Sequence, residues 1–174
     1  MKIIILFETG EGQTRKIADF IAGQIREAGH NIILVDTSDR MAKFSLIGAD
    51  KVILAAPVHE RRHPKNFEVA ISAAKQELAK YPTLMISVSL KAVFPEGQEE
   101  AKDYLTEMEM RTGFEPTQGV LVAGAVRSGS YDYFQSQIVR HVVLDGQHVE
   151  LTDGVKEFTD WAALAKTVAT FVGT

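Results

Sequence analysis

The sequence predicts a doubly wound α/β fold, a five-stranded parallel sheet with helices on both faces. Five short apolar segments alternate with segments of helical character along the 174 residues. The first of these, Lys2–Phe7, places Ile at three successive positions without polar alternation, as expected for a central strand covered on both faces. No repeat, low-complexity tract or linker interrupts the chain. We therefore expect a single domain over residues 1–174, with an insertion at about 127–158 between the last strand and the last helix.

The five expected strands are apolar runs bounded by turn residues. They span residues 2–7, 31–36, 51–56, 83–90 and 120–126. Pro57 stops the third strand, because proline cannot donate a hydrogen bond to a sheet.

The expected helices lie between these strands and after the last one. They span residues 15–28, 64–80, 96–111 and 160–172. Pro64 is placed in the first turn of its helix, where a missing N–H costs nothing. Gly113 is expected to end the third helix, and Asp160 to cap the last.

The loop after the first strand, Glu8–Thr14, is rich in Thr, Gly and Gln and leads into a helix. Its unpaired N–H groups and the dipole of the helix favour a bound phosphate. The loop has no Lys for a nucleoside triphosphate, and it has only Gly10 and Gly12 of the dinucleotide fingerprint, although Asp36 could serve as that motif's acidic residue. This pattern favours a phosphate monoester. Alternatively, the loop is only a tight turn, with Thr14 as the N-cap.

Composition excludes several functions. A net charge of −4 argues against binding nucleic acid, and the absence of Cys excludes disulfides and thiolate sites. The chain begins with a strand rather than a signal peptide, and no apolar run reaches the roughly 18 residues of a membrane span. We expect a cytoplasmic protein without a transmembrane segment.

Ligands of doubly wound sheets bind beyond the carboxyl ends of the strands. Three loops meet there: the phosphate loop, residues 57–65 after the third strand, and residues 87–95 after the fourth. One phosphate together with a slot for a flat ring favours flavin mononucleotide (FMN) over a dinucleotide.

Four short motifs resemble those of the flavodoxin-like family, and more narrowly its menaquinone-dependent protoporphyrinogen dehydrogenases. They are Ile5-Leu6-Phe7 with Gly12-Gln13-Thr14-Arg15 and Ile17-Ala18; Ser87-Val88 with Leu90; Ala123-Gly124-Ala125 with Arg127 and Tyr131; and Thr159-Asp160-Trp161. The first motif occurs in many flavodoxin relatives, whereas the last two are more specific to the subgroup. The resemblance covers nearly the whole chain and implies a flavodoxin-like fold.

The resemblance implies a non-covalent FMN and identifies the residues that would hold it. The residues that would surround the phosphate are Thr9, Gly10, Glu11, Gly12, Gln13 and Thr14. The residues that would line the ring are Pro57, Val58, His59 and Glu60 on one side, and Ser89, Leu90 and Lys91 on the other. Glu11 must point into solvent, since its carboxylate repels a phosphate.

Two features depart from electron-carrying flavodoxins, which resemble one another in stacking an aromatic ring on the flavin amid acidic residues. Residues 58–62 contain no aromatic residue, and the only Trp, Trp161, opens the last helix, which leaves a flavin face open to a second planar molecule. The surroundings are basic, with His59, Arg61, Arg62, His63 and Lys65 in one loop and Lys91 opposite. These cations either bind carboxylates, such as the propionates of a porphyrinogen, or form an ordinary solvated surface. We expect Arg61, Arg62 and Arg127 to contact the substrate.

The long connection before the last helix has apolar residues at helical spacing over residues 130–143. It is either a helix packed on the domain edge or an arm that contacts substrate or membrane. Residues 144–153 are acidic to neutral, whereas this region of the protoporphyrinogen dehydrogenases tends to be basic. Peripheral membrane contact and a porphyrinogen substrate are therefore only weakly supported.

Other chemistries fit less well. His59 and His63 have the spacing of helical metal ligands, but Pro64 disfavours a helix there, so no metal site is expected. Ser87 and Ser89 lack the motif of a hydrolytic nucleophile. The sequence predicts an FMN-dependent oxidoreductase, a quinone-linked protoporphyrinogen dehydrogenase or a close relative in haem biosynthesis, with a small-molecule reductant and a quinone acceptor. The alternatives are an electron carrier, an FMN-dependent quinone reductase and a regulatory relative without cofactor. No catalytic acid or base and no oligomeric state is predicted.

Overall fold

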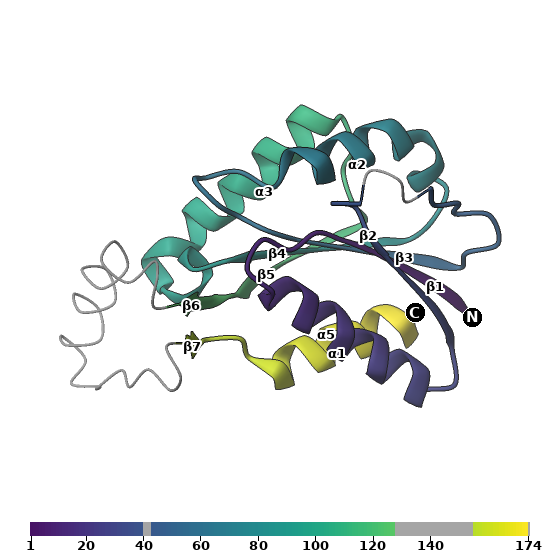
Figure 1. Cartoon of the computed structure of the whole chain (residues 1–174), viewed down its shortest axis with the longest axis horizontal. Coiled ribbons are helices and arrows are strands. Elements are labelled where there is room, and N and C mark those ends of the chain that lie inside the picture. Colours follow the sequence, from purple (N-terminus) through teal and green to yellow (C-terminus); the bar gives the residue numbers. More distant parts are fainter. Residues whose placement is uncertain (40–42, 128–154, 174) are drawn as a thin grey trace.

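A computed structural model describes residues 1–39, 43–127 and 155–173 of the chain (Figure 1). The strands are β1 (Lys2–Phe7), β2 (Asn31–Asp36), β3 (Lys51–Pro57), β4 (Thr83–Ser89), β5 (Gln118–Ala123), β6 (Ala125–Arg127) and β7 (Val155–Glu157). The helices are α1 (Gln13–Glu27), α2 (Lys65–Leu78), α3 (Gln98–Thr112) and α5 (Trp161–Gly173), with 3-10 turns η1 (Lys91–Val93) and η2 (Pro95–Gly97) before α3.

The main sheet has five parallel strands in the order β2-β1-β3-β4-β5, which confirms the predicted fold class. The chain runs outward from β1 to β2, then returns across β1 to β3. The strand order therefore reverses between β1 and β3, and this switch point is where doubly wound folds bind their ligands.

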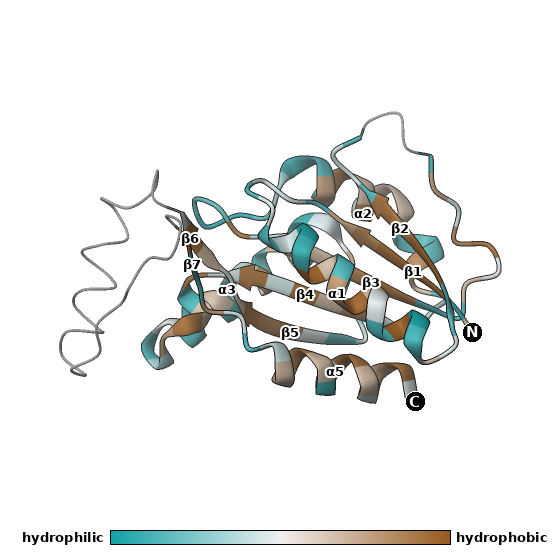
Figure 2. Cartoon of the chain, turned by 60° about the horizontal axis from the view of Figure 1, so that its bottom comes forward, coloured by the Kyte–Doolittle hydropathy of each residue, from teal (hydrophilic) through white to brown (hydrophobic). Residues whose placement is uncertain are grey.

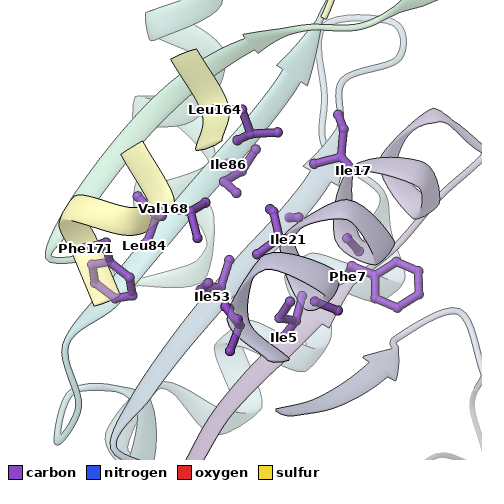
Figure 3. Close-up of a cluster of buried hydrophobic side chains, with 14 of the residues drawn as sticks. Ile5, Phe7, Ile17, Ile21, Ile53, Leu84, Ile86, Leu164, Val168 and Phe171 are labelled. Atoms are coloured by element: carbon purple, nitrogen blue, oxygen red, sulfur yellow. The ribbon is translucent and has the colours of Figure 1, made fainter. Parts of the chain in front are cut away.

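Helices cover both faces of this sheet, with α2 and α3 on one face and α1 and α5 on the other (Figure 1). Side chains of β1 alternate between the two cores. Ile3, Ile5 and Phe7 pack with α1 and α5, whereas Ile4 and Leu6 pack with α2 and α3. Figure 3 shows part of the first core. Because both faces are buried, the inner strands need no polar alternation, and they are mostly hydrophobic in Figure 2.

The predicted fifth strand is wrong beyond Ala123. β5 ends there, and after Gly124 the chain enters β6, which pairs antiparallel with β7 in a separate two-stranded ribbon. Gly124 lies close to β4, since a Cβ at this position would be 3.3 Å from Cγ1 of Val88. The ribbon leads into α5 through Phe158, whose N–H donates to the Gly124 carbonyl. The predicted insertion at 127–158 lies mostly outside the described residues and remains a prediction.

Helix boundaries agree with most of the predicted signals. Gly113 ends α3 in the left-handed conformation, and Oδ1 of Asp160 accepts the N–H of Ala163 at 2.9 Å. The predicted N-cap at Thr14 is wrong: α1 begins at Gln13 after Gly12, and Thr14 is buried in its first turn. The sequence predicts that the third helix begins at residue 96, but a 3-10 turn occupies 95–97 and α3 starts at Gln98. Among the described residues no helix is both long and apolar enough to cross a membrane.

Candidate functional site

A cavity of about 540 Å³ opens at the carboxyl edge of the sheet. Its walls come from the segments that follow β1, β3, β4 and β5, with two side chains added by α3. The lining residues are Thr9, Gly10, Glu11, Gln13, Thr14, Pro57, Val58, His59, Glu60, Arg61, Val88, Ser89, Leu90, Lys91, Glu100, Tyr104, Gly124, Ala125 and Val126. The cavity therefore includes the switch point between β1 and β3, where the sequence predicted a ligand.

The loop after β1 leaves the start of α1 without a side-chain cap. Gly12 adopts a φ of 97°, and its N–H donates to Oγ of Thr9 at 2.9 Å. Gly12 has no side chain that could accept hydrogen bonds from the first N–H groups of α1. These N–H groups and the helix dipole therefore favour an anion at this end of the cavity. A Cβ at Gly10 would lie 3.2 Å from Nε2 of His59, so a larger residue there would require this exposed side chain to shift slightly.

The side chain of Gln13 donates hydrogen bonds to the end of β7 and to the segment that follows it. Its Nε2 donates to Glu157 at 3.1 Å and to Oγ of Thr159 at 3.0 Å. Glu157 also accepts from Lys16 at 2.6 Å and from the indole N–H of Trp161 at 2.8 Å. Burial opposes ionisation, but these hydrogen bonds hold the pKa of Glu157 below its usual value. The ribbon is thus fastened to the helix that follows the phosphate loop.

The loop after β3 makes a tight two-residue turn into the cavity wall. His59 and Arg62 exchange both backbone hydrogen bonds at 3.0 Å. The two residues between them, Glu60 and Arg61, have φ values of 47° and 66°. Non-glycine residues pay roughly 1–2 kcal/mol for this conformation, so other contacts must hold the turn.

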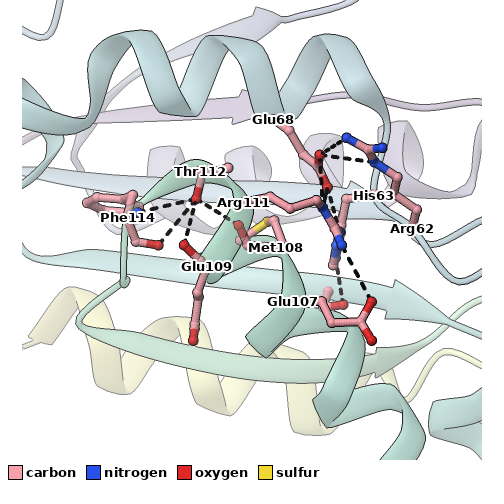
Figure 4. Close-up of polar contacts among 10 residues, drawn as sticks. Arg62, His63, Glu68, Glu107, Met108, Glu109, Arg111, Thr112 and Phe114 are labelled. Carbon is pink, nitrogen blue, oxygen red and sulfur yellow. Dashed lines mark hydrogen bonds and ion pairs between the residues drawn. The ribbon is translucent and has the colours of Figure 1, made fainter.

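One contact that holds this turn is an ion-pair cluster on Glu68 (Figure 4). Nη2 of Arg62 lies 2.6 Å from Oε2 of Glu68, and Nη2 of Arg111 lies 2.8 Å from Oε1. Burial of Glu68 raises its pKa, but the hydrogen bonds from Arg111 and Arg62 outweigh it and leave the pKa below normal. Arg62 therefore contacts Glu68 and is not among the residues that line the cavity, and its contact with a substrate stays a prediction.

His63 holds the other end of the loop. It is almost completely buried, and its Nε2 lies 2.9 Å from Oγ of Ser87. Burial lowers the pKa of His63 to about 4, so the ring is neutral at pH 7. Nδ1 is buried and has no hydrogen-bond partner among the described residues.

A second cluster, on Glu100, lies in the cavity wall itself. Oε1 of Glu100 accepts from Nη1 of Arg61 at 2.8 Å and from the Tyr104 hydroxyl, and Oε2 lies 2.9 Å from Nζ of Lys91. The Arg61 guanidinium also lies over the Tyr104 ring, 5.5 Å from its centroid. The hydrogen bond from Tyr104, followed by that from Lys91, lowers the pKa of Glu100, which keeps it ionised.

These clusters correct the interpretation of a basic rim. Arg61 and Lys91 share Glu100, Arg62 pairs with Glu68, and His63 is neutral. Each carboxylate is shared by two cations, so Glu100 and Glu68 together compensate half of the positive charge in these clusters. Sequence spacing could not reveal this, because the two carboxylates lie on α2 and α3.

The structure brings nearly all the predicted cofactor residues around one cavity. Every one of them lines it except Gly12, and Arg61 lines it as well. Arg127 ends β6, and its side chain lies outside the described part of the chain. Glu100 and Tyr104 were not predicted from the sequence, although a helix that follows a strand also starts at the ligand-binding edge of the sheet. Among the described residues no group of acidic residues and histidines could hold a metal ion.

Comparison with known proteins agrees with this geometry. Residues 4–150 match the model of a flavodoxin domain. Protoporphyrinogen IX dehydrogenase [quinone] of Escherichia coli is 28% identical over 171 residues, which cover 95% of this chain and 91% of that protein.

Solved structures show the same fold. Oxidised Flavodoxin 2 from Bacillus cereus superimposes with a TM-score of 0.60 at 18% identity, covering 99% of each chain. The flavodoxin of Fusobacterium nucleatum bound to flavin mononucleotide has a TM-score of 0.51 at 13% identity, covering 99% of this chain and 95% of that one.

Proposed function

Because the chain belongs to the flavodoxin domain family, we propose that its cavity binds FMN and that the protein is an FMN-dependent oxidoreductase. The substrate that we propose is a protoporphyrinogen or a closely related reductant of haem biosynthesis, with a quinone as electron acceptor. One observation carries this proposal: the phosphate loop and both loops expected to flank the ring line a single cavity at the switch point.

The cavity has the chemistry that FMN needs. Its volume of about 540 Å³ lies within the range of small-ligand sites, roughly 300–1,000 Å³. Backbone N–H groups of residues 10, 11, 13 and 14 and the hydroxyls of Thr9 and Thr14 would hold the phosphate, whereas the Gly12 N–H donates to Thr9. Glu11 is exposed, so its carboxylate can remain in solvent while its N–H contributes.

The ring would lie between the loops that follow β3 and β4. Val58 and His59 would cover one side, and Ser89, Leu90 and Lys91 the other. The bound flavin supplies the redox chemistry, and the residues around it position the ring and its reaction partner. We assign no side chain as a proton donor or acceptor in the reaction.

A dehydrogenase needs room for a second molecule beside the flavin. The turn at 59–62 presents no aromatic side chain, and the aromatic residue that lines the cavity, Tyr104, comes from α3. This arrangement, together with the 28% identity to the E. coli enzyme, supports a small-molecule substrate. The insertion at 127–158 and any contact that it makes with a membrane stay predictions.

A second candidate is an electron carrier that exchanges electrons with protein partners. It is favoured by the pairing of the loop cations with Glu68 and Glu100, which reduces the positive charge available to an anionic substrate. The same pairing leaves an FMN-dependent quinone reductase open, since a quinone needs no cationic site.

Two measurements test the proposal. The purified protein should be yellow, or become yellow with added FMN, and should release FMN on denaturation. It should then oxidise protoporphyrinogen in the presence of a menaquinone analogue. A colourless protein that does not bind FMN contradicts the cofactor, whereas a yellow protein without turnover that a flavodoxin reductase can reduce is a carrier.

A further inference from the structure

The Glu100 cluster has the geometry of an occupied anion site. Each oxygen of the Glu100 carboxylate meets a different cation, Arg61 at 2.8 Å and Lys91 at 2.9 Å. The two cations come from two different loops that line the cavity, after β3 and after β4, and the carboxylate between them comes from α3.

We propose that Arg61 and Lys91 form a subsite for a carboxylate group of the second ligand, and that Glu100 occupies this subsite as an internal competitor until that group displaces it. The inference rests on the proposed function only in placing this ligand beside bound FMN.

The contacts define the class of ligand. Two cations that bridge the two oxygens of one carboxylate are spaced for a carboxylate, and an arginine adds a planar fork that matches this group. Arg61 and Lys91 are accessible to a ligand, since their side chains are 65% and 41% exposed. Together they carry two positive charges, of which Glu100 neutralises one.

Glu100 can leave this position without losing all its partners. Its side chain is 28% exposed, so the carboxylate reaches solvent after a rotation. The Tyr104 hydroxyl is a third donor to Glu100, and this residue is on the same helix, one turn away. Tyr104 therefore holds Glu100 near the subsite.

Glu100 makes the subsite selective for charged ligands. A neutral ring that displaces Glu100 forms no ion pair with Arg61 or Lys91, whereas a carboxylate replaces both ion pairs that the displacement breaks. The cluster thus discriminates against uncharged ligands of the same shape.

The test is calorimetric titration of the purified protein, with and without FMN, using phthalate, its neutral analogue phthalamide, and inorganic phosphate. We expect Glu100→Gln to tighten phthalate binding roughly fivefold to tenfold and Tyr104→Phe to tighten it about twofold, because each removes part of the competitor's hold. Arg61→Gln and Lys91→Gln should each weaken binding at least about fivefold. Lys65→Gln, an exposed cation outside the cavity, is the matched control and should change nothing.

Several results would overturn the inference. They are unchanged or weaker phthalate binding in Glu100→Gln, an equal effect of Lys65→Gln and Arg61→Gln, and equal responses to phthalamide or phosphate. If neither the original protein nor Glu100→Gln binds phthalate, the subsite does not exist. If the variants change phthalate binding as expected but the protein binds no FMN, the subsite is supported and the proposed function is rejected. If the protein binds FMN but the variants do not change phthalate binding, the proposed cofactor is supported and the subsite is rejected.

Discussion

Stability between pH 7 and pH 5 should depend on His63. Its ring is buried and neutral in the folded protein, with a pKa of about 4, against about 6.5 when unfolded. As the pH falls below 6.5 the unfolded chain gains a proton that the folded chain does not bind. The contribution of His63 to the free energy of unfolding is therefore fully present above pH 6.5 and is lost progressively as the pH falls toward 4.

The two pKa values set the size of the effect. Between pH 7 and pH 5 the linkage relation gives a loss of about 2 kcal/mol from this one residue. The Glu68 carboxylate, whose pKa is lowered, contributes stability that is lost only below about pH 4.5, so it does not enter this window.

The assay is urea unfolding at pH 7 and pH 5 for the original protein and His63→Gln. We expect the difference between the two pH values to be about 2 kcal/mol smaller in His63→Gln, because glutamine does not titrate. Other groups, including Glu8 with its pKa raised by burial, titrate in both proteins and cancel. His59 is exposed, so His59→Gln should retain the difference. Equal pH dependence in His63→Gln and the original protein would refute a buried neutral His63.

Three further predictions concern the cavity. Thr14→Ala should weaken FMN binding about tenfold in a fluorescence titration, since a hydroxyl donor to the phosphate is lost. Thr14→Ser keeps the hydroxyl and should keep the affinity for FMN. Equal affinities of Thr14→Ala and the original protein would show that this hydroxyl does not contact the phosphate. Arg61→Ala should impair substrate turnover but leave the protein yellow. Unchanged steady-state kinetics would show that Arg61 does not contact the substrate. Glu60→Asn should raise the free energy of unfolding by roughly 0.5–1 kcal/mol, because asparagine tolerates the φ of 47° better than glutamate. Glu60→Ala is its control, and an equal gain from both would exclude strain relief as the cause.

Local sequence predicted the sheet well. β1 and β2 have the predicted bounds, because β-branched runs between turn residues favour strands wherever they are buried. The same reasoning failed at Gly124, where seven apolar and small residues in a row read as one strand. The main-sheet pairing ends there because the chain leaves β4 and pairs with β7 instead. That partner lies about thirty residues away in the sequence, so no local pattern could identify it.

The loops of the site were predictable for a similar reason. Parallel strands bring their carboxyl ends to one edge, so residues that follow β1, β3 and β4 must meet there. Spacing along the chain could not show which of those residues face the cavity. Arg61 and Arg62 are neighbours, yet one contacts Glu100 in the cavity wall and the other contacts Glu68 outside it.

The sequence by itself determined the layered fold, and it was enough to predict the edge of the sheet for a ligand and the loop for a phosphate. These follow from the order of apolar and turn residues and from the handedness of the chain. Only the tertiary structure decided the charge of the site, because it depends on partners from other elements. Glu100 pairs with Arg61 and Glu68 with Arg111, partners about forty residues away in the sequence, and burial keeps His63 uncharged. Charge in a cavity depends on three-dimensional distance and access to water, and neither can be read from the order of residues.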